Sequence, residues 1–543
     1  MTTSRRQFIK LGTGTLAGLC LSRHYAVAMS AAKELSQQAA NPMRLIDLSQ
    51  FNTTDFTGDD INKPHDILWN IDGYIQKKGG LPAIEGDFET IIVGGGIAGL
   101  TAAYELRDKK PLLLEQSPRF GGNSQGEIYG QSAFSIGAAY IVAPDEQSRM
   151  GQMLIDIGLL GKGRVEFSDN TTVLFHQDLI NSFWTKGVQP QDAAGTKKVF
   201  DKLVEIRDNW DLDPLSAQGQ VLNRMSFEQW LSQEIPDCPE SVKEYFQLYC
   251  WSSFCASIDE IAASNMLGYL CDETTALMAF PGGNSAIAEG LYRKLRRELP
   301  KGHLQNDAMV MRVEVDGDSV VVLFEDAVGV LRRVRAKAVV MACQKFVARR
   351  LLPQLPADQD KAIQSIRYRG YLVANVIFKK QIQSPSFELY CLKGDVPPAP
   401  STMRPPKRGF TDICFGSWAQ GDNVQNGILT LYKGLPMDGT RQFMFKPGYH
   451  EKIKGQIMAE LPYVLKGLNL KESDILGMRL TRWGHSLPLA EVGIHSNGVM
   501  EKINQPLGGR IFFANQDSAI DPCFESAVAT VYEATDAIRS LLK

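Results

Sequence analysis

Several features are missing from this sequence, and each absence excludes a kind of protein. Beyond residue 28 no apolar run is long enough to span a membrane, so we expect no stable membrane insertion of the remaining chain. The formal net charge is −3, and lysine and arginine form no basic stripe. Nucleic acid is therefore not expected as a partner.

Patterns typical of metal sites are also absent. The nine cysteines include no CxxC pair and no cluster with histidine at ligand spacing, so no metal site is predicted. Cys250 and Cys255 lie in an aromatic-rich stretch of helical character and are interpreted as core residues. With 44% hydrophobic and 22% charged residues, the 543-residue chain has a globular composition and is long enough for two domains.

The first 28 residues have the pattern of an export signal. Arg5-Arg6 precedes Phe8, an apolar stretch follows from Leu11 to Leu21, and Ala26-Val27-Ala28 supplies the small residues of a cleavage site. This pattern predicts a twin-arginine signal that is recognised by the twin-arginine export machinery. We therefore expect a periplasmic or secreted protein that is exported folded, with any cofactor already bound.

A glycine-rich loop near residue 95 gives the first chemical signal. Phe88 to Val93 is a short β-branched run typical of a buried parallel strand, and a helical pattern continues from Leu100. The glycines between them have G-x-G-x-x-G spacing, which brings the N–H groups of a helix start close to a pyrophosphate. The sequence therefore predicts a dinucleotide site formed by Gly94, Gly96, Ile97, Ala98 and Gly99.

A second strand supports this prediction. Pro111 to Leu114 is followed by Glu115, which lies 19 residues after Gly96. A carboxylate at that distance from the loop is suited to bind a ribose hydroxyl. The segment from Phe88 to Glu115 is thus expected to form a βαβ unit around the ligand.

The remaining segments indicate an α/β fold with interleaved domains. Residues 29–85 are polar with an aromatic patch and are interpreted as an N-terminal arm. Residues 146–275 have mostly helical patterns, whereas residues 305–343 alternate as strands that return to a buried run. We assign residues 86–145, 276–345 and 476–543 to a discontinuous cofactor-binding domain, and residues 146–275 and 346–475 to a substrate-binding domain.

Motifs after the second strand indicate the type of dinucleotide. The run EQSPRFGGNS from Glu115 to Ser124 resembles the flavin-containing amine oxidase superfamily, in which an acidic residue is followed by Arg-x-Gly-Gly. The resemblance implies a Rossmann-like FAD-binding domain interleaved with a substrate domain of mixed sheet and helices. It places at the cofactor Glu115, Gln116, Arg119, Gly121, Gly122, Asn123 and Ser124, with Val310 as a backbone contact to the adenine.

The C-terminal run GRIFFANQD, starting at Gly509, resembles the closing FAD motif of the same family, a strand that ends at an acidic residue. Here Asn515-Gln516-Asp517 replaces the usual pair, so either Gln516 or Asp517 is expected at the ribityl chain. The next helix opens with Phe524-Glu525-Ser526-Ala527, and its positive end would stabilise charge on the reduced flavin. The implied cofactor is FAD, contacted by Gln516, Asp517, Glu525, Ser526 and Ala527.

The sequence departs from the family pattern in two places. Tyr371 to Phe378 lacks the lysine that many family oxidases have near the flavin, which favours an electron acceptor other than oxygen. Both oxygen and a periplasmic electron carrier remain candidate acceptors. Leu487 to Gly493 lacks the cysteine that tethers flavin in monoamine oxidases, which predicts noncovalent FAD. Two short runs, FPGGN from Phe280 and RWGH from Arg482, resemble elements of bacterial spermidine dehydrogenase.

The resemblance implies oxidation of an amine (a polyamine, a monoamine or an amino acid) by hydride transfer from the carbon next to nitrogen. Trp483 and His485 are predicted to form the flavin-facing substrate wall, and Glu127, Asp517 and Glu525 are candidates for attracting the amine. Two alternatives remain. A desaturase-like enzyme of the same fold would have a long apolar channel, and an exported flavoprotein without catalysis would not be reduced by any small substrate.

Overall fold

The structure is a computed structural model that describes residues 40–60, 62–167, 171–214, 216–384, 386–400 and 408–543. The predicted twin-arginine signal in residues 1–28 lies outside the described residues, as does the first part of the predicted arm. Among the helices in these ranges, none combines the length and the apolar character that a membrane-crossing segment requires.

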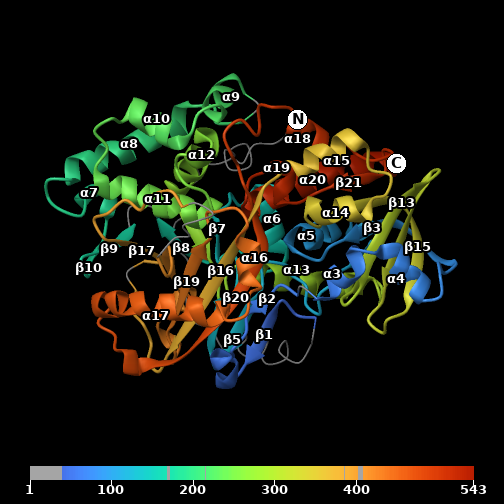
Figure 1. Ribbon diagram of the computed structural model, residues 1–543, viewed down its shortest axis with the longest axis horizontal. Coiled ribbons are helices and arrows are strands. Elements are labelled where there is room, and N and C mark those ends of the chain that lie inside the picture. Colours follow the sequence, from blue (N-terminus) through green and yellow to red (C-terminus); the bar gives the residue numbers. More distant parts are fainter. Residues whose placement is uncertain (1–39, 61, 168–170, 215, 385, 401–407) are drawn as a thin grey trace.

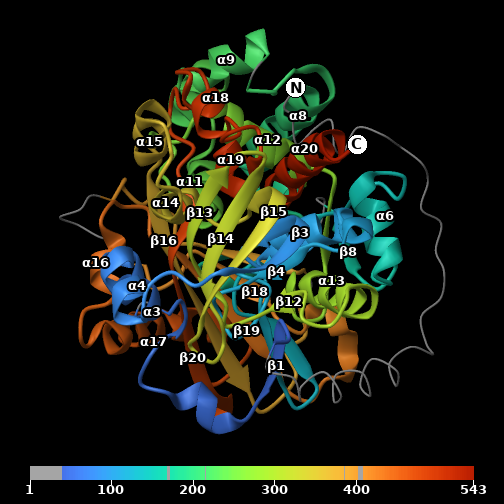
Figure 2. The ribbon, with the colours of Figure 1, turned by 90° about the vertical axis from the view of Figure 1, so that its right-hand side faces the viewer.

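A seven-stranded sheet contains the glycine loop at the end of its central strand. Its order is β12-β4-β3-β15-β14-β13, with β21 paired to β15. The strands are β3 (Ile84–Val93), β4 (Leu112–Leu114), β12 (Leu304–Gln305), β13 (Met309–Asp316), β14 (Ser319–Glu325), β15 (Leu331–Met341) and β21 (Ile511–Phe513). The β13–β15 segment is an antiparallel meander whose last strand returns beside β3, as the sequence predicts; Figure 2 shows it facing the viewer.

Helices cover both faces of this sheet, which is why its central strands are continuously apolar. On one face lie α5 (Ile97–Glu105), α13 (Ser285–Glu298) and α20 (Phe524–Leu541), packed through Leu100, Leu291 and Val528. On the other face α14 (Lys345–Leu351) packs against Ile91 and Val339. The predicted strand–turn–helix unit around the glycines is therefore present. Its strand, β3, begins at Ile84, four residues before the predicted start at Phe88.

An eight-stranded sheet forms the second half of the molecule, with order β10-β9-β17-β18-β19-β16-β20-β2. Its strands are β2 (Thr57–Gly58), β9 (Thr172–Phe175), β10 (Asp178–Ile180), β16 (Tyr368–Phe378), β17 (Glu388–Leu392), β18 (Asp412–Phe415), β19 (Ile428–Gly434) and β20 (Ile475–Pro488). The sequence assigns β20 to the cofactor-binding domain, but β20 pairs with β16 along most of its length. β20 belongs to the eight-stranded sheet because it pairs in register with the buried strand β16. The local sequence of β20 does not show which strand will be its partner.

A group of helices covers one end of the eight-stranded sheet, drawn in green in Figure 1. They are α7 (Phe183–Lys186), α8 (Ala193–Asn209), α9 (Ala217–Asn223), α10 (Phe227–Glu234), α11 (Glu240–Phe254) and α12 (Ala263–Glu273). Ser226 and Gln229 form the predicted helix start as a capping box at α10. The stretch from 146 to 275 is mostly helical, as the sequence predicts, but three strands that were not predicted from the sequence interrupt it: β8 (Arg164–Phe167), β9 and β10.

The remaining elements complete two small sheets and the outer layer. The sheets are β1-β5-β6, from Met43–Ile46, Gly126–Tyr129 and Ser132–Ser135, and β7-β11-β8, in which β7 is Tyr140–Val142 and β11 is Ala276–Ala279. The other helices are α6 (Arg149–Asp156), α15 (Ala357–Gln364), α16 (Thr440–Met444), α17 (Tyr449–Gly467), α18 (Val499–Ile503) and α19 (Gln516–Ala519).

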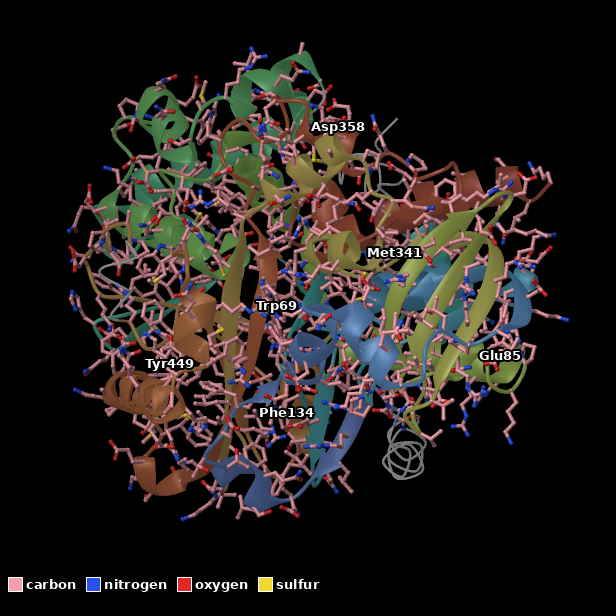
Figure 3. All side chains as sticks on the ribbon, turned by 45° about the vertical axis from the view of Figure 1, so that its right-hand side comes forward. Trp69, Glu85, Phe134, Met341, Asp358 and Tyr449 are labelled. Carbon is pink, nitrogen blue, oxygen red and sulfur yellow. The ribbon has the colours of Figure 1, made fainter. Side chains whose placement is uncertain are left out.

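The described part of the arm is built into both halves of the molecule. Its strand β1 pairs with β5, its strand β2 pairs with β20, and its helices α3 (Asn62–Leu68) and α4 (Ile71–Lys77) pack on the meander through Ile67 and Ile75. Figure 3 labels Trp69 on this arm, between the long strands of the eight-stranded sheet and the meander. The arm is therefore a structural link between the two large sheets.

One buried carboxylate makes the stability of this fold depend on pH. Glu289 on α13 is fully buried, its oxygens accept no hydrogen bond, and the nearest cation, Arg293 Nε, is 3.5 Å from Oε1. Burial raises the pKa of Glu289 from 4.5 to about 7. Because the folded protein then binds more protons than the unfolded chain between these values, its stability falls as pH rises through this window.

Replacing Glu289 by glutamine removes this ionisation. We expect Glu289→Gln to be more stable than the wild type at pH 8, by about 3 kcal/mol, and about equally stable near pH 4.5. Thermal melting of both proteins across this pH range measures the difference. A melting temperature that shifts equally at both pH values would contradict the assignment.

Candidate active site

A cavity of about 1040 Å³ runs between the two large sheets, and most predicted cofactor residues line it. They are Gly94, Gly96, Ile97, Ala98, Glu115, Gln116, Arg119, Gly121, Gly122, Asn123, Ser124, Val310, Gln516, Glu525 and Ala527. The predicted wall residues Trp483 and His485 line it as well. Gly99, Asp517 and Ser526 do not, and each has another role in the structure.

The glycine loop closes tightly over the start of α5. Gly94 has a φ of +105°, a backbone conformation that side chains rarely adopt, and Gly96 is the N-cap of α5. A Cβ on Gly99 would lie 1.8 Å from the Gly94 carbonyl oxygen. Gly99 therefore lets the helix pack against the loop, and Gly94, Gly96, Ile97 and Ala98 line the cavity, where the N-terminus of α5 is suited to bind phosphate.

Glu115 holds the glycine loop in place. Its Oε2 accepts from the Gly95 N–H at 2.6 Å and its Oε1 accepts from the Ser117 N–H at 2.8 Å. Burial is the main cause of a raised pKa for this carboxyl. Its place beside the cavity fits the predicted ribose contact, because a carboxylate oxygen accepts more than one hydrogen bond.

Three arginines surround one carboxylate in the cofactor section of the cavity. Arg44 and Arg479 both form ion pairs with Glu127, at 3.3 and 2.5 Å, and Arg119 lies near the same carboxylate. Burial lowers the pKa of Arg119 to about 10, and it stays charged at neutral pH. All four side chains line the cavity, so this section carries an excess of positive charge that suits a diphosphate.

In the C-terminal motif the neighbouring residues Gln516 and Asp517 point in different directions. Gln516 lines the cavity and donates from Nε2 to the Ser486 carbonyl at 2.6 Å. Asp517 points away and accepts at 2.6 Å from both the Lys345 N–H and the Tyr368 hydroxyl. Of the two residues expected at the ribityl chain, Gln516 is thus the one that faces the cavity.

The start of α20 is also fixed locally. Glu525 accepts from the Val142 N–H at 2.8 Å, and the Ser526 hydroxyl donates back to the Cys523 carbonyl at 3.1 Å. Cys523 is the N-cap of this helix, its Sγ accepts from the Ser526 N–H at 3.2 Å, and Ser526 does not line the cavity. Ala527 lines the cavity one residue further on, which brings the positive end of α20 to the predicted cofactor section.

Trp483 and His485 both lie on β20, but their surroundings differ. Trp483 Nε1 donates to the Ile136 carbonyl at 2.8 Å. His485 stacks on Phe346 with ring centroids 3.8 Å apart, and its Nε2 accepts from Arg441 Nη1 at 2.6 Å. Burial, with Arg441 and His65 nearby, lowers the pKa of His485 to about 3, so the ring is neutral and acts as an acceptor.

The far end of the cavity has an aromatic section that leads to carboxylates. Tyr140, Tyr371, Tyr432 and Trp483 form the aromatic section, and the carboxylates are Glu273, Glu388 and Asp412. On neighbouring strands Asp412 lies opposite Tyr432, and Glu388 lies opposite Cys414. Opposite residues, and residues two apart on one strand, share a face of a sheet, so these side chains project into the same space.

These carboxylates are not the ones expected from the sequence. Glu127 is paired with arginine, Asp517 is held by Lys345 and Tyr368, and Glu525 holds the β7 backbone. The sequence does not indicate a role for Glu388 or Asp412, because each is a single acidic residue in a short strand, ELYCL and DICF. An isolated acid in an otherwise apolar strand is the signal that could have indicated them, since buried carboxylates are rare without a partner.

The cavity fits a flavin dinucleotide in shape and charge. The glycine loop, Glu115 and the arginine-rich section lie along one part of it, and the aromatic section lies along another. Among the described residues one group of three potential metal ligands occurs, Glu388, Asp412 and Cys414, whose ligand atoms lie within 4.8 Å of one another.

The packing of Gly99 gives a direct test of the cofactor site. We expect Gly99→Ala to lose bound flavin, because the added methyl group forces the loop away from α5. The ratio of absorbance at the flavin band to that of protein, measured after purification, should fall by more than half. Gly455→Ala is the matched control, since its Cβ would meet no atom within 4 Å and flavin content should not change. Full flavin content in Gly99→Ala would contradict this account of the loop.

Comparison with known proteins agrees with this geometry. Oxidoreductase PigB of Serratia sp. (strain ATCC 39006) is 25% identical over 522 residues, which cover 84% of this chain and 76% of PigB. Wild-type putrescine oxidase bound to putrescine has the same fold, with a TM-score of 0.62, 14% identity and coverage of 84% of this chain and 99% of the other. Cyclohexylamine oxidase from Brevibacterium oxydans IH-35A gives a TM-score of 0.62 and 17% identity at the same coverage.

These solved structures confirm the predicted fold class, an α/β fold with a Rossmann-like cofactor domain. The family model described as flavin containing amine oxidoreductase matches residues 97–534, which include the helix after the glycine loop, every strand of the two large sheets except β3 and β2, and the first part of α20. The chain thus belongs to the family of flavin-containing amine oxidoreductases.

Proposed function

We propose that the protein binds FAD noncovalently and oxidises an amine at the carbon next to nitrogen. The observation that carries this proposal is a single cavity whose lining includes the dinucleotide loop, the aromatic section and the carboxylates of Glu273, Glu388 and Asp412. An anionic, aromatic cavity attracts an organic cation, and the aromatic faces stabilise it. Membership of the family supports the same chemistry.

When bound, FAD would supply a two-electron acceptor for the hydride of the substrate carbon next to nitrogen, and water would hydrolyse the oxidised substrate to a carbonyl compound and an amine or ammonia. The protein supplies position and a dry environment. Tyr371 and Tyr432 are fixed by their hydroxyls, which bond to Ser252 Oγ at 2.9 Å and to the Gly137 carbonyl at 2.6 Å. Their rings therefore form rigid walls that orient the substrate and exclude water.

The carboxylates also distinguish this function from desaturation of an apolar substrate. A desaturase-like enzyme would gain nothing from Glu273, Glu388 and Asp412 in the substrate section, because burying carboxyl groups without a cationic ligand is costly. The aromatic walls and the acidic end together favour an amine. The absence of lysine from β16 favours an acceptor other than oxygen, and we propose a dehydrogenase.

An anaerobic absorbance titration tests the function. We expect the flavin band of the purified protein to bleach with at least one amine from a panel of monoamines, diamines, polyamines and L-amino acids. Recovery on admitting air should be slow compared with recovery on adding an artificial electron acceptor. Absence of bleaching by every amine would overturn the proposal, and fast recovery in air would instead identify an oxidase.

Noncovalent binding is tested on the same protein. After acid precipitation the flavin should stay in the supernatant, and a yellow pellet would show a covalent bond. This outcome is independent of the substrate.

We further propose export by the twin-arginine route, on the basis of residues 1–28. Replacing Arg5 and Arg6 together by lysine should leave the full-length precursor, with its flavin, in the cytoplasm, because the transport machinery recognises the arginine pair. Cell fractionation with an antibody against the protein measures this. Unchanged export of the double variant would exclude the route.

A further inference from the structure

Two carboxylates at the acidic end of the cavity have no cation of the protein beside them. Asp412 is fully buried, its Oδ1 accepts from the Thr411 hydroxyl at 2.5 Å, and its Oδ2 has no hydrogen-bond partner. Glu388 lies within 4.8 Å of Asp412 and lines the same cavity. No ion pair among the described residues includes either side chain, and the main influences on their pKa values are burial and the neighbouring carboxyl and hydroxyl groups.

This arrangement is unfavourable for the protein alone. Burial, then the neighbouring Asp412 and Glu273, raises the pKa of Glu388 well above its usual value, and burial raises the pKa of Asp412. By contrast, Glu127, which is as buried as Asp412, is paired with Arg479. A pair of desolvated acids that face a cavity without a protein cation is best explained by a cationic ligand that enters between them.

The position of the pair along the sheet shows which part of a ligand it would meet. The C-terminal cofactor motif contacts the sheet at β20, through the bond from Gln516 to the Ser486 carbonyl. From β20 the strands follow as β16, β19, β18 and β17. Neighbouring strands are about 4.8 Å apart, so Asp412 on β18 lies about 14 Å along the sheet from β20 and Glu388 about 19 Å.

The aromatic section occupies the space between these ends. Tyr371 lies opposite Trp483, and Tyr432 lies opposite both Val373 and Asp412. A carbon chain next to the flavin would therefore extend along aromatic rings before it reaches the carboxylates. A nitrogen held by Asp412 and Glu388 is thus separated from the cofactor motif by the aromatic section, so the carbon that is oxidised belongs to another part of the substrate.

We propose that Asp412 and Glu388 bind a second, non-reacting ammonium group, and that the substrate is an aliphatic diamine or polyamine. This inference rests on the proposed amine oxidation. Glu273 completes the anionic end, where the Tyr140 hydroxyl donates to its Oε1 at 3.1 Å. The orphaned Asp412 Oδ2 accepts from the distal ammonium, which supplies up to three donors for the surrounding oxygens.

A metal ion is the competing ligand for the same place. Cys414 would be the third ligand, and its buried thiol would have to lose its proton to bind the ion. Three protein ligands also fall short of the closed four-ligand set of a structural zinc site. An ammonium ion needs neither a thiolate nor fixed coordination geometry, and we therefore favour it.

The test compares 1,4-diaminobutane and spermidine with n-butylamine, which lacks the second nitrogen. Anaerobic stopped-flow reduction of the flavin-loaded wild type gives an apparent Kd and a limiting rate for each amine. We expect the Kd of a diamine or of spermidine to be at least tenfold below that of butylamine. Asp412→Asn and Glu388→Gln should each raise that Kd about 10- to 100-fold, the effect of one charge-assisted hydrogen bond, and leave the Kd of butylamine within twofold.

Glu289→Gln is the matched control, because it removes a buried carboxylate on α13 outside the cavity and should leave both Kd values unchanged. Equal affinity of the wild type for butylamine and the polyvalent amines would overturn the inference without any variant. An equal loss for both kinds of amine in Asp412→Asn would overturn it too. So would a stoichiometric metal ion whose removal by chelation abolishes the preference. If no amine reduces the flavin, the proposed function itself fails, which is a different result.

Discussion

Three buried hydrogen bonds to one short stretch of backbone join the two halves of this molecule. Asn375 donates to the Ser135 carbonyl at 3.1 Å, Trp483 to the Ile136 carbonyl at 2.8 Å and Tyr432 to the Gly137 carbonyl at 2.6 Å. The donors come from β16, β20 and β19, and the acceptors precede residues that line the cofactor section. Because buried carbonyls need partners, these bonds fix the distance between the cofactor segment and the substrate wall. The aromatic section depends on that spacing.

Buried charge is handled in two opposite ways inside the same cavity. In the cofactor section Glu127 is neutralised by Arg479, and further arginines leave a positive excess. In the substrate section Asp412 and Glu388 have no such partner. The first arrangement suits an anionic diphosphate and the second a cationic amine, so opposite ends of one cavity select opposite ligands. Desolvation strengthens both preferences, since little water screens the charges.

The cofactor half could be predicted from sequence because its signals are local. The glycine loop, Glu115 and the meander from Met309 to Met341 are each specified by neighbouring residues. The substrate half depends on contacts between distant segments. Glu388 and Asp412 are 24 positions apart and reach one cavity only through the pairing of β17 with β18, and β20 joins the second sheet because of its register with β16. Neither strand pairing can be recognised from a periodic pattern in the sequence, so the carboxylates at the acidic end of the cavity could not be predicted.

The arm has a consequence for the order in which this chain can fold. Thr57 in β2 lies beside Thr481 in β20, and their hydroxyls are 2.9 Å apart, although 424 positions separate them along the chain. During synthesis the edge of the eight-stranded sheet therefore waits for almost the whole polypeptide to leave the ribosome. The entropic cost of closing so long a loop grows only slowly with length, but the partner strand must exist first. The strand β2, although it lies near the start of the described chain, is thus among the last to reach its final place.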